Sequence, residues 1–539
     1  MLSHRRYWLY IPLFLAACTF LGGKYGPSMF SASAQQQNAS PTSDDDLKAS
    51  IESFTKIYDV VDQNYADKLS PDKAIYKGAI PGMLRTLDPH SNFFDPKEFA
   101  SMREDQHGSY FGVGMTIGPQ PRTGKIMVIH PFGGTPAYRA GLRPGDVFLE
   151  INDKRVDTAT SAEIADMLKG PKGTGVQVTV TREGAAKPLT FNLIRDEIPH
   201  NSVDEAFWVR PGIAFIRIQQ FTETTSKEVE DNLHRLGEQN IKGLILDLRG
   251  NPGGLLQEGV AVAGRWLDRG QVVVSHKGRA YAEKPYLARG SQYGESYPIV
   301  VLVDRYSASA AEIVSGALQD HDRAWILGDV TFGKGLVQTV YPLSDNTGLA
   351  LTTQHYYTPS GRLIQRDYSN LSFLDYYYGK RSQVKDPMDV KQTDLGRVVY
   401  GGGGITPDEK YEPPKLDAFE LNTMRKNAFF DFSAFYFSNH STKLPNNWIP
   451  DENILNDFHD FLMKKGVEFS EADWTRDHSW VRDELRQEMY VTAFSYEDSL
   501  KIGVEQDPEV QKAIAAMPEA AKLLAMSRDR FQKQRASLQ

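Results

Sequence analysis

The region from Gly212 to Gln365 alternates apolar strand signals with helical segments, and this pattern constrains the fold more than any other feature of the chain. Two of its strands read GLILDLRG and PIVVLVD, which are apolar at nearly every position. Such strands must be covered on both faces, and strands that alternate with helices usually run parallel. We therefore predict an α/β core on a mostly parallel sheet, with its chemistry at the carboxyl ends of the strands.

The segment that precedes this core, from about Gly108 to Arg195, shows short strands and turns. GKIMVIHPF and GVQVTVTRE are expected as strands, and SAEIADMLKG as a helix between them. A stretch of about 90 residues with this pattern predicts a separate compact domain.

Helical patterns flank both regions. Apolar residues recur at helical spacing from Ile51 to Val61 and predict helices up to about Ala100, with LDPHS (87–91) as a turn. Beyond Asp408 the chain is polar and helical, and its aromatic residues at 429–437 are expected to pack against the core or a second subunit. The predicted regions are 1–34 (signal peptide or membrane anchor), 35–44 (linker), 45–107 (N-terminal helices), 108–199 (inserted domain), 200–415 (core) and 416–539 (helical C-terminal extension).

The N-terminus predicts export. MLSHRR is basic, and an apolar run follows at 7–22. This run is short for a spanning helix and typical of a signal sequence. Three outcomes stay open: cleavage after Ala34, acylation of Cys18 within a lipoprotein-like LAAC box, or an uncleaved anchor. Each would place the rest of the chain in the periplasm or cell envelope, with membrane contact through the N-terminus.

Composition excludes several classes of protein. The net charge is −8 and no dense Lys/Arg cluster occurs, so nucleic acid is not expected as a partner. Cys18 is the only cysteine, which excludes internal disulfides and cysteine-based metal sites. The histidines show no H-E-x-x-H spacing. We therefore expect no metal site of these kinds, and the chemistry considered below needs no metal or organic cofactor.

Ser309 opens a helical pattern in the stretch YSASAAEIVSGALQD. With Glu312 it forms S-x-x-E, a helix-capping pattern, and capping is the commoner role of such a serine. The start of a helix also offers free N–H groups and a positive dipole end, which suit a nucleophile whose attack creates an oxyanion. This stretch alone does not separate the two roles.

A second candidate is Lys334, which stands between Gly333 and Gly335. With Gly328 it matches the start of a P-loop, but Gly335 replaces the required Ser/Thr and a strand pattern follows, so we reject that reading. A lysine that is removed from water can act as a general base. Gln338 lies four residues on, which places it on the same face of a strand as Lys334. The Gly-rich RGNPGG loop (249–254) could hold an anion with its N–H groups.

These motifs, together with LDPHS, GLILDLRGNPGG, GDVTFGKGLVQ and YYTPSGRLIQ, resemble the carboxyl-terminal processing peptidases, or tail-specific proteases, from the N-terminal helices to about Asp408. The resemblance implies a ClpP/crotonase-like α/β serine peptidase core with an inserted PDZ-like domain. It also implies Ser309 as the nucleophile, Lys334 as the general base and Gln338 as the residue that orients the lysine. The oxyanion hole would be formed by the N–H groups of Ala310 and Gly253. The chain departs from many members at Ala311, where they have a third serine, and at Asp304–Tyr306, where they have a Gly-rich turn.

The block around AGLRPGDVFLEIND resembles PDZ domains, which capture free peptide C-termini. Its carboxylate-binding loop would be Gly112, Val113, Gly114 and Met115. The expected partners are therefore proteins or peptides with free C-termini, and self-association is left open. The rival hypotheses are a non-catalytic envelope protein that binds peptides or apolar ligands on the same fold, and an adaptor for another protease. Neither would need serine, lysine and glutamine together.

Overall fold

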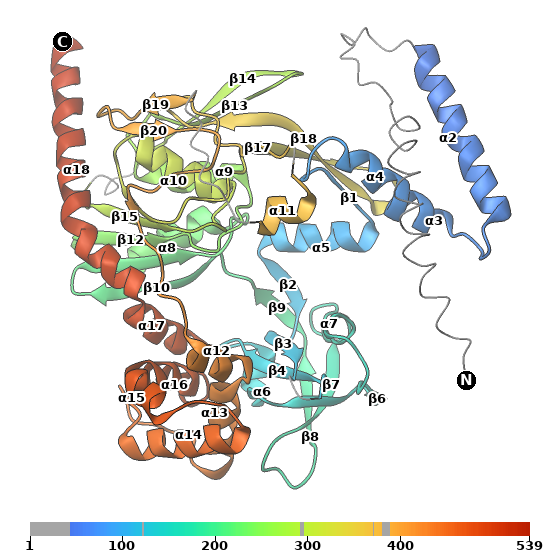
Figure 1. Cartoon of the computed structure of the whole chain (residues 1–539), viewed down its shortest axis with the longest axis vertical. Coiled ribbons are helices and arrows are strands. Elements are labelled where there is room, and N and C mark those ends of the chain that lie inside the picture. Colours follow the sequence, from blue (N-terminus) through green and yellow to red (C-terminus); the bar gives the residue numbers. More distant parts are fainter. Residues whose placement is uncertain (1–43, 121–122, 291–295, 370, 380–388, 539) are drawn as a thin grey trace, which may run out of the picture. The chain divides into compact units, whose positions relative to one another are not determined.

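The structure is a computed structural model, and it describes residues 44–120, 123–290, 296–369, 371–379 and 389–538 (Figure 1). The apolar run at 7–22, Ala34 and Cys18 lie outside the described residues. The chain divides into two units, residues 1–79 and 80–539, and each is described by itself.

The first unit is helical where it is described. Its helices are α2 (Asp44–Asn64), α3 (Pro71–Ala74) and the π-helix η2 (Ile75–Ala79). The predicted apolar spacing of Ile51, Phe54 and Val61 lies on α2. Across the described residues, no helix has the length and hydropathy that a bilayer crossing requires.

The second unit contains the predicted α/β core. Its central sheet has the order β10-β11-β12-β15-β16-β21, and every neighbouring pair is parallel except β10 and β11. The strands are β10 (Val203–Arg210), β11 (Ile213–Ile218), β12 (Gly243–Asp247), β15 (Ile299–Val303), β16 (Trp325–Gly328) and β21 (Glu409–Lys410). The helices between them are α8 (Thr225–Leu236), α9 (Leu256–Arg265) and α10 (Ala310–Asp320), with the 3₁₀ turn η3 (Glu238–Asn240) after α8.

Both faces of this sheet are covered, as its apolar strands predict. Consecutive residues of one strand point to opposite faces, and Leu244 and Ile245 of β12 accordingly belong to two different buried clusters. The first cluster includes residues of α8, α9 and α10. The second includes Val510, Ala513 and other residues of α18 (Pro508–Leu538). The C-terminal extension therefore completes the core, which sequence patterns did not reveal.

A second sheet brings the N-terminal segment to the core. Its order is β1-β18-β13-β14, and β17 also pairs with β18. The strands are β1 (Asn92–Phe94), β13 (Val272–Gly278), β14 (Tyr281–Leu287), β17 (Leu336–Pro342) and β18 (Gly348–Tyr357), with the 3₁₀ turn η4 (Ser344–Asn346) before β18. The helical prediction up to Ala100 is wrong at β1, because this strand is defined by a partner far along the chain, Asn92 opposite Ala350. Helices α4 (Ile80–Arg85) and α5 (Pro96–His107) flank β1.

The PDZ-like domain contains a sheet of order β3-β4-β5-β7-β8, and β6 pairs with β5. Its elements are β3 (Met115–Pro119), β4 (Ile126–Pro131), α6 (Pro136–Ala140), β5 (Val147–Ile151), β6 (Lys154–Arg155), α7 (Ser161–Leu168), β7 (Gly175–Thr181) and β8 (Leu189–Ile194). The chain enters this domain through β2 (Ser109–Gly112) and leaves it through β9 (Asp196–Pro199), and these two strands pair antiparallel (Figure 1).

In its described part, the C-terminal extension consists of helices and the loops that connect them. Its helices before α18 are α12 (Ala418–Arg425), α13 (Ala428–Asn439), α14 (Glu452–Lys465), α15 (Glu471–Arg476), α16 (His478–Ala493) and α17 (Tyr496–Gln506). Phe429 and Phe432 pack on Phe458 of α14, with ring centroids 4.9 and 5.1 Å apart. The aromatic segment therefore packs within its own helical bundle, whereas we expected packing against the core or a second subunit.

Candidate active site

Ser309 stands at the junction between β15 and α10, at the carboxyl edge of the central sheet. Its backbone has φ 54° and ψ −113°, a conformation that residues other than glycine rarely adopt. Such strain persists only where the surroundings fix it, and it is concentrated at functional sites. Ala310, the first residue of α10, follows it directly.

The buried Glu312 carboxylate connects Ser309 to the lysine loop. Its Oε2 accepts hydrogen bonds from the backbone N–H groups of Ser309 at 2.9 Å and Lys334 at 2.8 Å. Its Oε1 accepts from the Thr331 hydroxyl at 2.6 Å and the Gly333 N–H at 2.7 Å. One side chain thus fixes both the helix start and the loop that carries the candidate base.

Lys334 lies just before β17, and its Nζ donates to Gln338 Oε1 at 3.0 Å. Among the described residues, no ion pair reaches this ammonium group. Burial lowers the pKa of Lys334 below that of a free lysine, against the opposing effect of the Glu312 and Asp88 charges. A lysine in this state can give up its proton at a pH at which exposed lysines keep theirs.

The NPGG loop lies against Ser309. A Cβ atom on Gly253 would come within 2.6 Å of Ser309 Cβ and 3.0 Å of the Ala310 nitrogen, so the close approach requires glycine. The Gly253 N–H, the predicted oxyanion donor, donates to Asn251 Oδ1 at 2.8 Å in this structure. That N–H would have to exchange its partner before it could hold an oxyanion.

Ser307, the neighbouring serine, has a structural environment. It is fully buried, and its hydroxyl donates to the Leu248 carbonyl at 2.8 Å and accepts from the Asp304 N–H at 2.9 Å. These bonds tie the loop after β15 to the loop after β12.

The structure therefore brings Ser309, Ala310, Gly253, Lys334 and Gln338 to one region of the core. The predicted PDZ loop lies in the PDZ-like domain instead: Gly112 ends β2, Val113 is buried, Gly114 has φ 79° and Met115 begins β3. Strand β3 is the edge strand of its sheet, as strand addition by a peptide requires.

Sequence reasoning missed two features of this region. Glu312 was visible only as the last letter of S-x-x-E, and the LDPHS turn only as a turn. The structure places that turn beside Phe332 of the lysine loop, where the His90 ring meets the Phe332 ring edge-on. The signal that could have found Glu312 is its position three residues after the nucleophile candidate.

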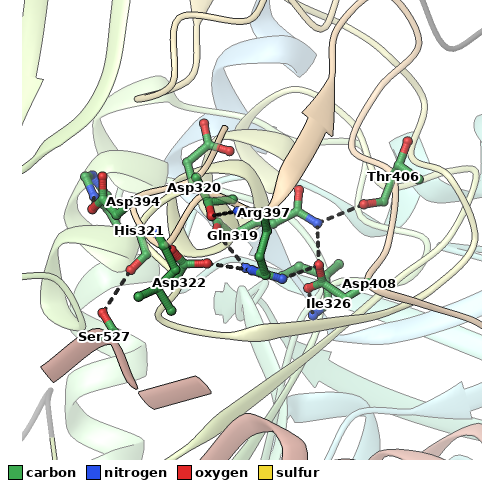
Figure 2. A network of polar contacts seen from close by, with 12 residues as sticks. Gln319, Asp320, His321, Asp322, Ile326, Asp394, Arg397, Thr406, Asp408 and Ser527 are labelled. Atoms are coloured by element: carbon green, nitrogen blue, oxygen red, sulfur yellow. Dashed lines mark hydrogen bonds and ion pairs between the residues drawn. The ribbon is translucent and has the colours of Figure 1, made fainter. Parts of the chain in front are cut away.

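The far end of α10 is held by a different kind of network (Figure 2). Arg362 has a fully buried side chain, and it donates to Asp320 Oδ1 at 2.7 Å and Gln319 Oε1 at 2.8 Å. Arg397 pairs with Asp322 at 2.6 Å and with Asp408 at 2.5 Å, as Figure 2 shows. This network fixes α10 to the segments that follow β18.

Comparisons with known proteins agree with this architecture. The profile of peptidase family S41 matches residues 212–369, that of the PDZ domain matches 133–182, and that of the activating protease CtpB N-terminal domain matches 14–98. The chain is 38% identical over 316 residues to a carboxy-terminal-processing protease of Bartonella bacilliformis, covering 58% of this chain and 72% of that protein. It is 35% identical over 356 residues to a carboxyl-terminal-processing protease of Synechocystis sp., covering 64% and 81%. It is 31% identical over 397 residues to the carboxy-terminal processing protease CtpB of Bacillus subtilis, covering 72% and 81%.

The chain belongs to the family of carboxyl-terminal processing proteases, which are serine-type peptidases. The predicted resemblance and the multidomain α/β fold with a PDZ domain are confirmed. A protease with a PDZ domain fits protein or peptide substrates. The rival hypothesis of a non-catalytic binding protein is correspondingly disfavoured.

Proposed function

We propose that this protein is a serine endopeptidase of the cell envelope that recognises substrate C-termini and cuts with Ser309, Lys334 and Gln338. The observation that carries the proposal is the state of Lys334, a partly exposed lysine whose amine is desolvated and held by Gln338 Oε1, on a loop that Glu312 joins to Ser309. A buried amine that lacks a direct ion pair can be neutral, and only a neutral amine can serve as the base.

In the proposed reaction, Lys334 Nζ takes the proton from Ser309 as its Oγ attacks the scissile carbonyl carbon. The tetrahedral intermediate collapses when the C–N bond breaks, and the lysine ammonium returns the proton to the leaving amine. Water then attacks the acyl carbon with Lys334 again as base. The C–Oγ ester bond breaks, the lysine ammonium returns the proton to Ser309 Oγ, and the new C-terminus leaves. Gln338 keeps the amine aimed at Ser309 through its Oε1.

The oxyanion is assigned to the N–H groups of Ala310 and Gly253. Ala310 supplies the first N–H of α10, where the helix dipole is positive. Gly253 supplies its N–H when the oxyanion replaces Asn251 Oδ1 as the acceptor. Each such donor typically contributes about 3 kcal/mol to transition-state stabilisation.

Substrate capture is assigned to the PDZ-like domain, with Gly112, Val113, Gly114 and Met115 around the terminal carboxylate.

The envelope location rests on the N-terminal sequence, with export through residues 7–22 and attachment there or at Cys18. We keep the division at 108–199, 200–415 and 416–539 as the working domain boundaries. Mass spectrometry of the mature N-terminus would decide how the first 34 residues are processed.

The test is cleavage of an unfolded protein substrate by the wild-type enzyme and its Ser309→Ala variant. We expect the wild type to cut and the variant to leave the substrate intact. Equal cleavage by both would refute the assignment. Substrates with free and amidated C-termini, compared in the same assay, test the capture step, and equal rates on both would reject it.

The pH dependence tests the base. Because Lys334 must be neutral, kcat/KM should be lost at low pH and rise through one apparent pKa below that of a free lysine. A profile that is flat across neutral pH would count against Lys334. Lys334→Ala, which has no amine, supplies the control.

A further inference from the structure

We propose that the Leu87–Ser91 turn is part of the catalytic machinery, with the buried Asp88 carboxylate as a positioning residue that acts on Lys334. The inference rests on the proposed function, since it concerns the base of that reaction. It assigns a role to LDPHS, the motif for which sequence analysis offered only a turn.

The turn is built to hold one carboxylate in place. Asp88 is 7% exposed, and its Oδ1 accepts from the backbone N–H groups of His90 and Ser91, both at 2.8 Å. Its Oδ2 accepts from the Ser91 hydroxyl at 2.7 Å. No ion pair joins Asp88 to a lysine or arginine in the described part of the chain. A buried carboxylate held only by neutral donors keeps its charge available to its surroundings.

The turn is attached to the strand beside the catalytic loop. Ser91 Oγ accepts from the backbone N–H of Thr352 at 3.0 Å, and Thr352 stands opposite Gln338 in the pairing of β17 with β18. Strand β1 continues this attachment along β18. Through Ser91, Asp88 is therefore attached at the residue pair Thr352–Gln338, and Gln338 is the residue that holds Lys334.

Two buried carboxylates act on Lys334, and neither forms an ion pair with it. Glu312 of α10 and Asp88 of the turn both raise the pKa of Lys334, against the larger lowering by burial. Each carboxylate is held by other hydrogen bonds, so neither needs to rotate onto the ammonium. A charge that acts from a fixed distance adjusts the basicity of the amine and leaves its lone pair free for Ser309.

Besides Glu312 and Asp88, the titratable groups around Lys334 contribute no third negative charge near neutral pH. His90 lies between Tyr376 and Tyr377, whose hydroxyls are 3.0 and 3.1 Å from its two ring nitrogens. Burial, and then the charge of Lys334, lower the pKa of His90 to about 3, so the ring is neutral. Burial raises the pKa of the Tyr356, Tyr376 and Tyr377 hydroxyls, which keep their protons. The positive charge of Arg366 also lowers the pKa of His90, and its guanidinium lies over the Phe332 and Tyr376 rings.

The experiment measures kcat/KM against pH for the full-length wild type, Asp88→Asn and Ser91→Ala. Asp88→Asn removes the charge but keeps an oxygen that can accept the two N–H bonds. Without the negative charge the lysine loses its proton more easily, so the acidic limb should move to lower pH. Ser91→Ala is the matched control, because it removes hydrogen bonds of the turn and no charge. Its limb should stay at the wild-type pH even where its rate falls.

An acidic limb of Asp88→Asn that stays in place or moves to higher pH would overturn the inference. So would an equal displacement in Ser91→Ala, which would indicate a structural effect of the turn. If Asp88→Asn does not fold, as judged by circular dichroism and thermal unfolding, Asp88→Ser is measured against the same criterion. Ser309→Ala separates the two claims: cleavage by that variant refutes the proposed function, whereas a dead Ser309→Ala with an unmoved Asp88→Asn limb refutes only the role of Asp88.

Discussion

The two ends of α10 use buried carboxylates in opposite ways. At its start, Glu312 is surrounded by N–H and hydroxyl donors and has no direct cation in the described structure. At its end, Asp320 is paired with Arg362. Asp322 is paired with Arg397, as Figure 2 shows. Dipoles hold the first carboxylate in place, whereas full charges neutralise the others.

We therefore expect the carboxylate at the start of α10 to affect catalysis and the carboxylates at its end to affect stability. An arginine beside Glu312 would bring a permanent positive charge close to Lys334. That charge would cancel the effect of the Glu312 carboxylate on the pKa of Lys334. Neutral donors hold Glu312 without that interference. The arginines at the other end form buried ion pairs with Asp320 and Asp322. Removing one partner of such a pair leaves the other as an uncompensated buried charge, which lowers the free energy of unfolding. Variants at each end should therefore fail in different assays.

The largest effect is expected at the active end, from Lys334→Met. The proposed base is lost and the side-chain volume is kept, so kcat should fall by on the order of 10⁴-fold. The free energy of unfolding should not decrease, since a buried amine is replaced by an apolar group. Cleavage of an unfolded substrate and urea denaturation measure the two quantities. A stable variant that cuts at the wild-type rate would contradict the assignment of Lys334.

At the other end, Asp320→Asn should mainly destabilise. It leaves the fully buried Arg362 guanidinium without its counter-charge, at an expected cost of about 3–5 kcal/mol. Urea denaturation of the variant and of Asp320→Asn/Arg362→Met measures it, and the double variant should recover part of the loss. A variant with wild-type stability and lost cleavage would show that Asp320 serves cleavage rather than stability.

Glu312→Gln should combine both kinds of effect at smaller size. A glutamine offers one acceptor oxygen, so two of the four donors lose their partner, at about 1–3 kcal/mol. We expect kcat to fall roughly 10²-fold, because the same loss releases either Ser309 or the lysine loop. The acidic limb of kcat/KM should also move to lower pH, since Glu312 raises the pKa of Lys334. An unmoved limb would limit Glu312 to a structural role.

The smallest effect concerns His321, the residue after α10. Burial lowers its pKa, but hydrogen bonds to Asp394 at 2.7 Å and the Val272 carbonyl at 2.8 Å outweigh burial and raise it. A raised pKa gives stability that is complete below the pKa of the unfolded state and is lost as pH rises through that of the folded state. The thermal unfolding midpoints of wild type and Asp394→Asn should therefore differ most at low pH and converge above neutrality. A difference that grows with pH would contradict this sign.

The local features of the catalytic core could be predicted from the sequence. Apolar strands, the helix start at Ser309 and the Lys334–Gln338 spacing depend on residues close together in the chain, and the structure places those two side chains within hydrogen-bond distance. The family resemblance supplied the roles that spacing alone left open.

The features that sequence patterns missed depend on distant partners. Asn92–Phe94 forms a strand because Gly348–Ala350 lies beside it, and no short window shows that pairing. Arg362 looks like an ordinary surface arginine in GRLIQ, yet it is fully buried against Asp320. The role of α18 as the cover of one sheet face likewise requires the sheet to exist first.

The paired strands β2 and β9 have a consequence for how this protease evolves. They join the PDZ-like domain to the core by one short antiparallel ladder, Ser109 opposite Pro199 and Gly112 opposite Asp196, so its two ends lie side by side. A domain whose two ends lie side by side can be replaced by another domain without changing the path of the chain on either side. If the PDZ-like domain selects substrates as proposed, substrate choice and peptide cleavage can diversify at separate rates, since a new recognition domain needs only to preserve the two connecting strands.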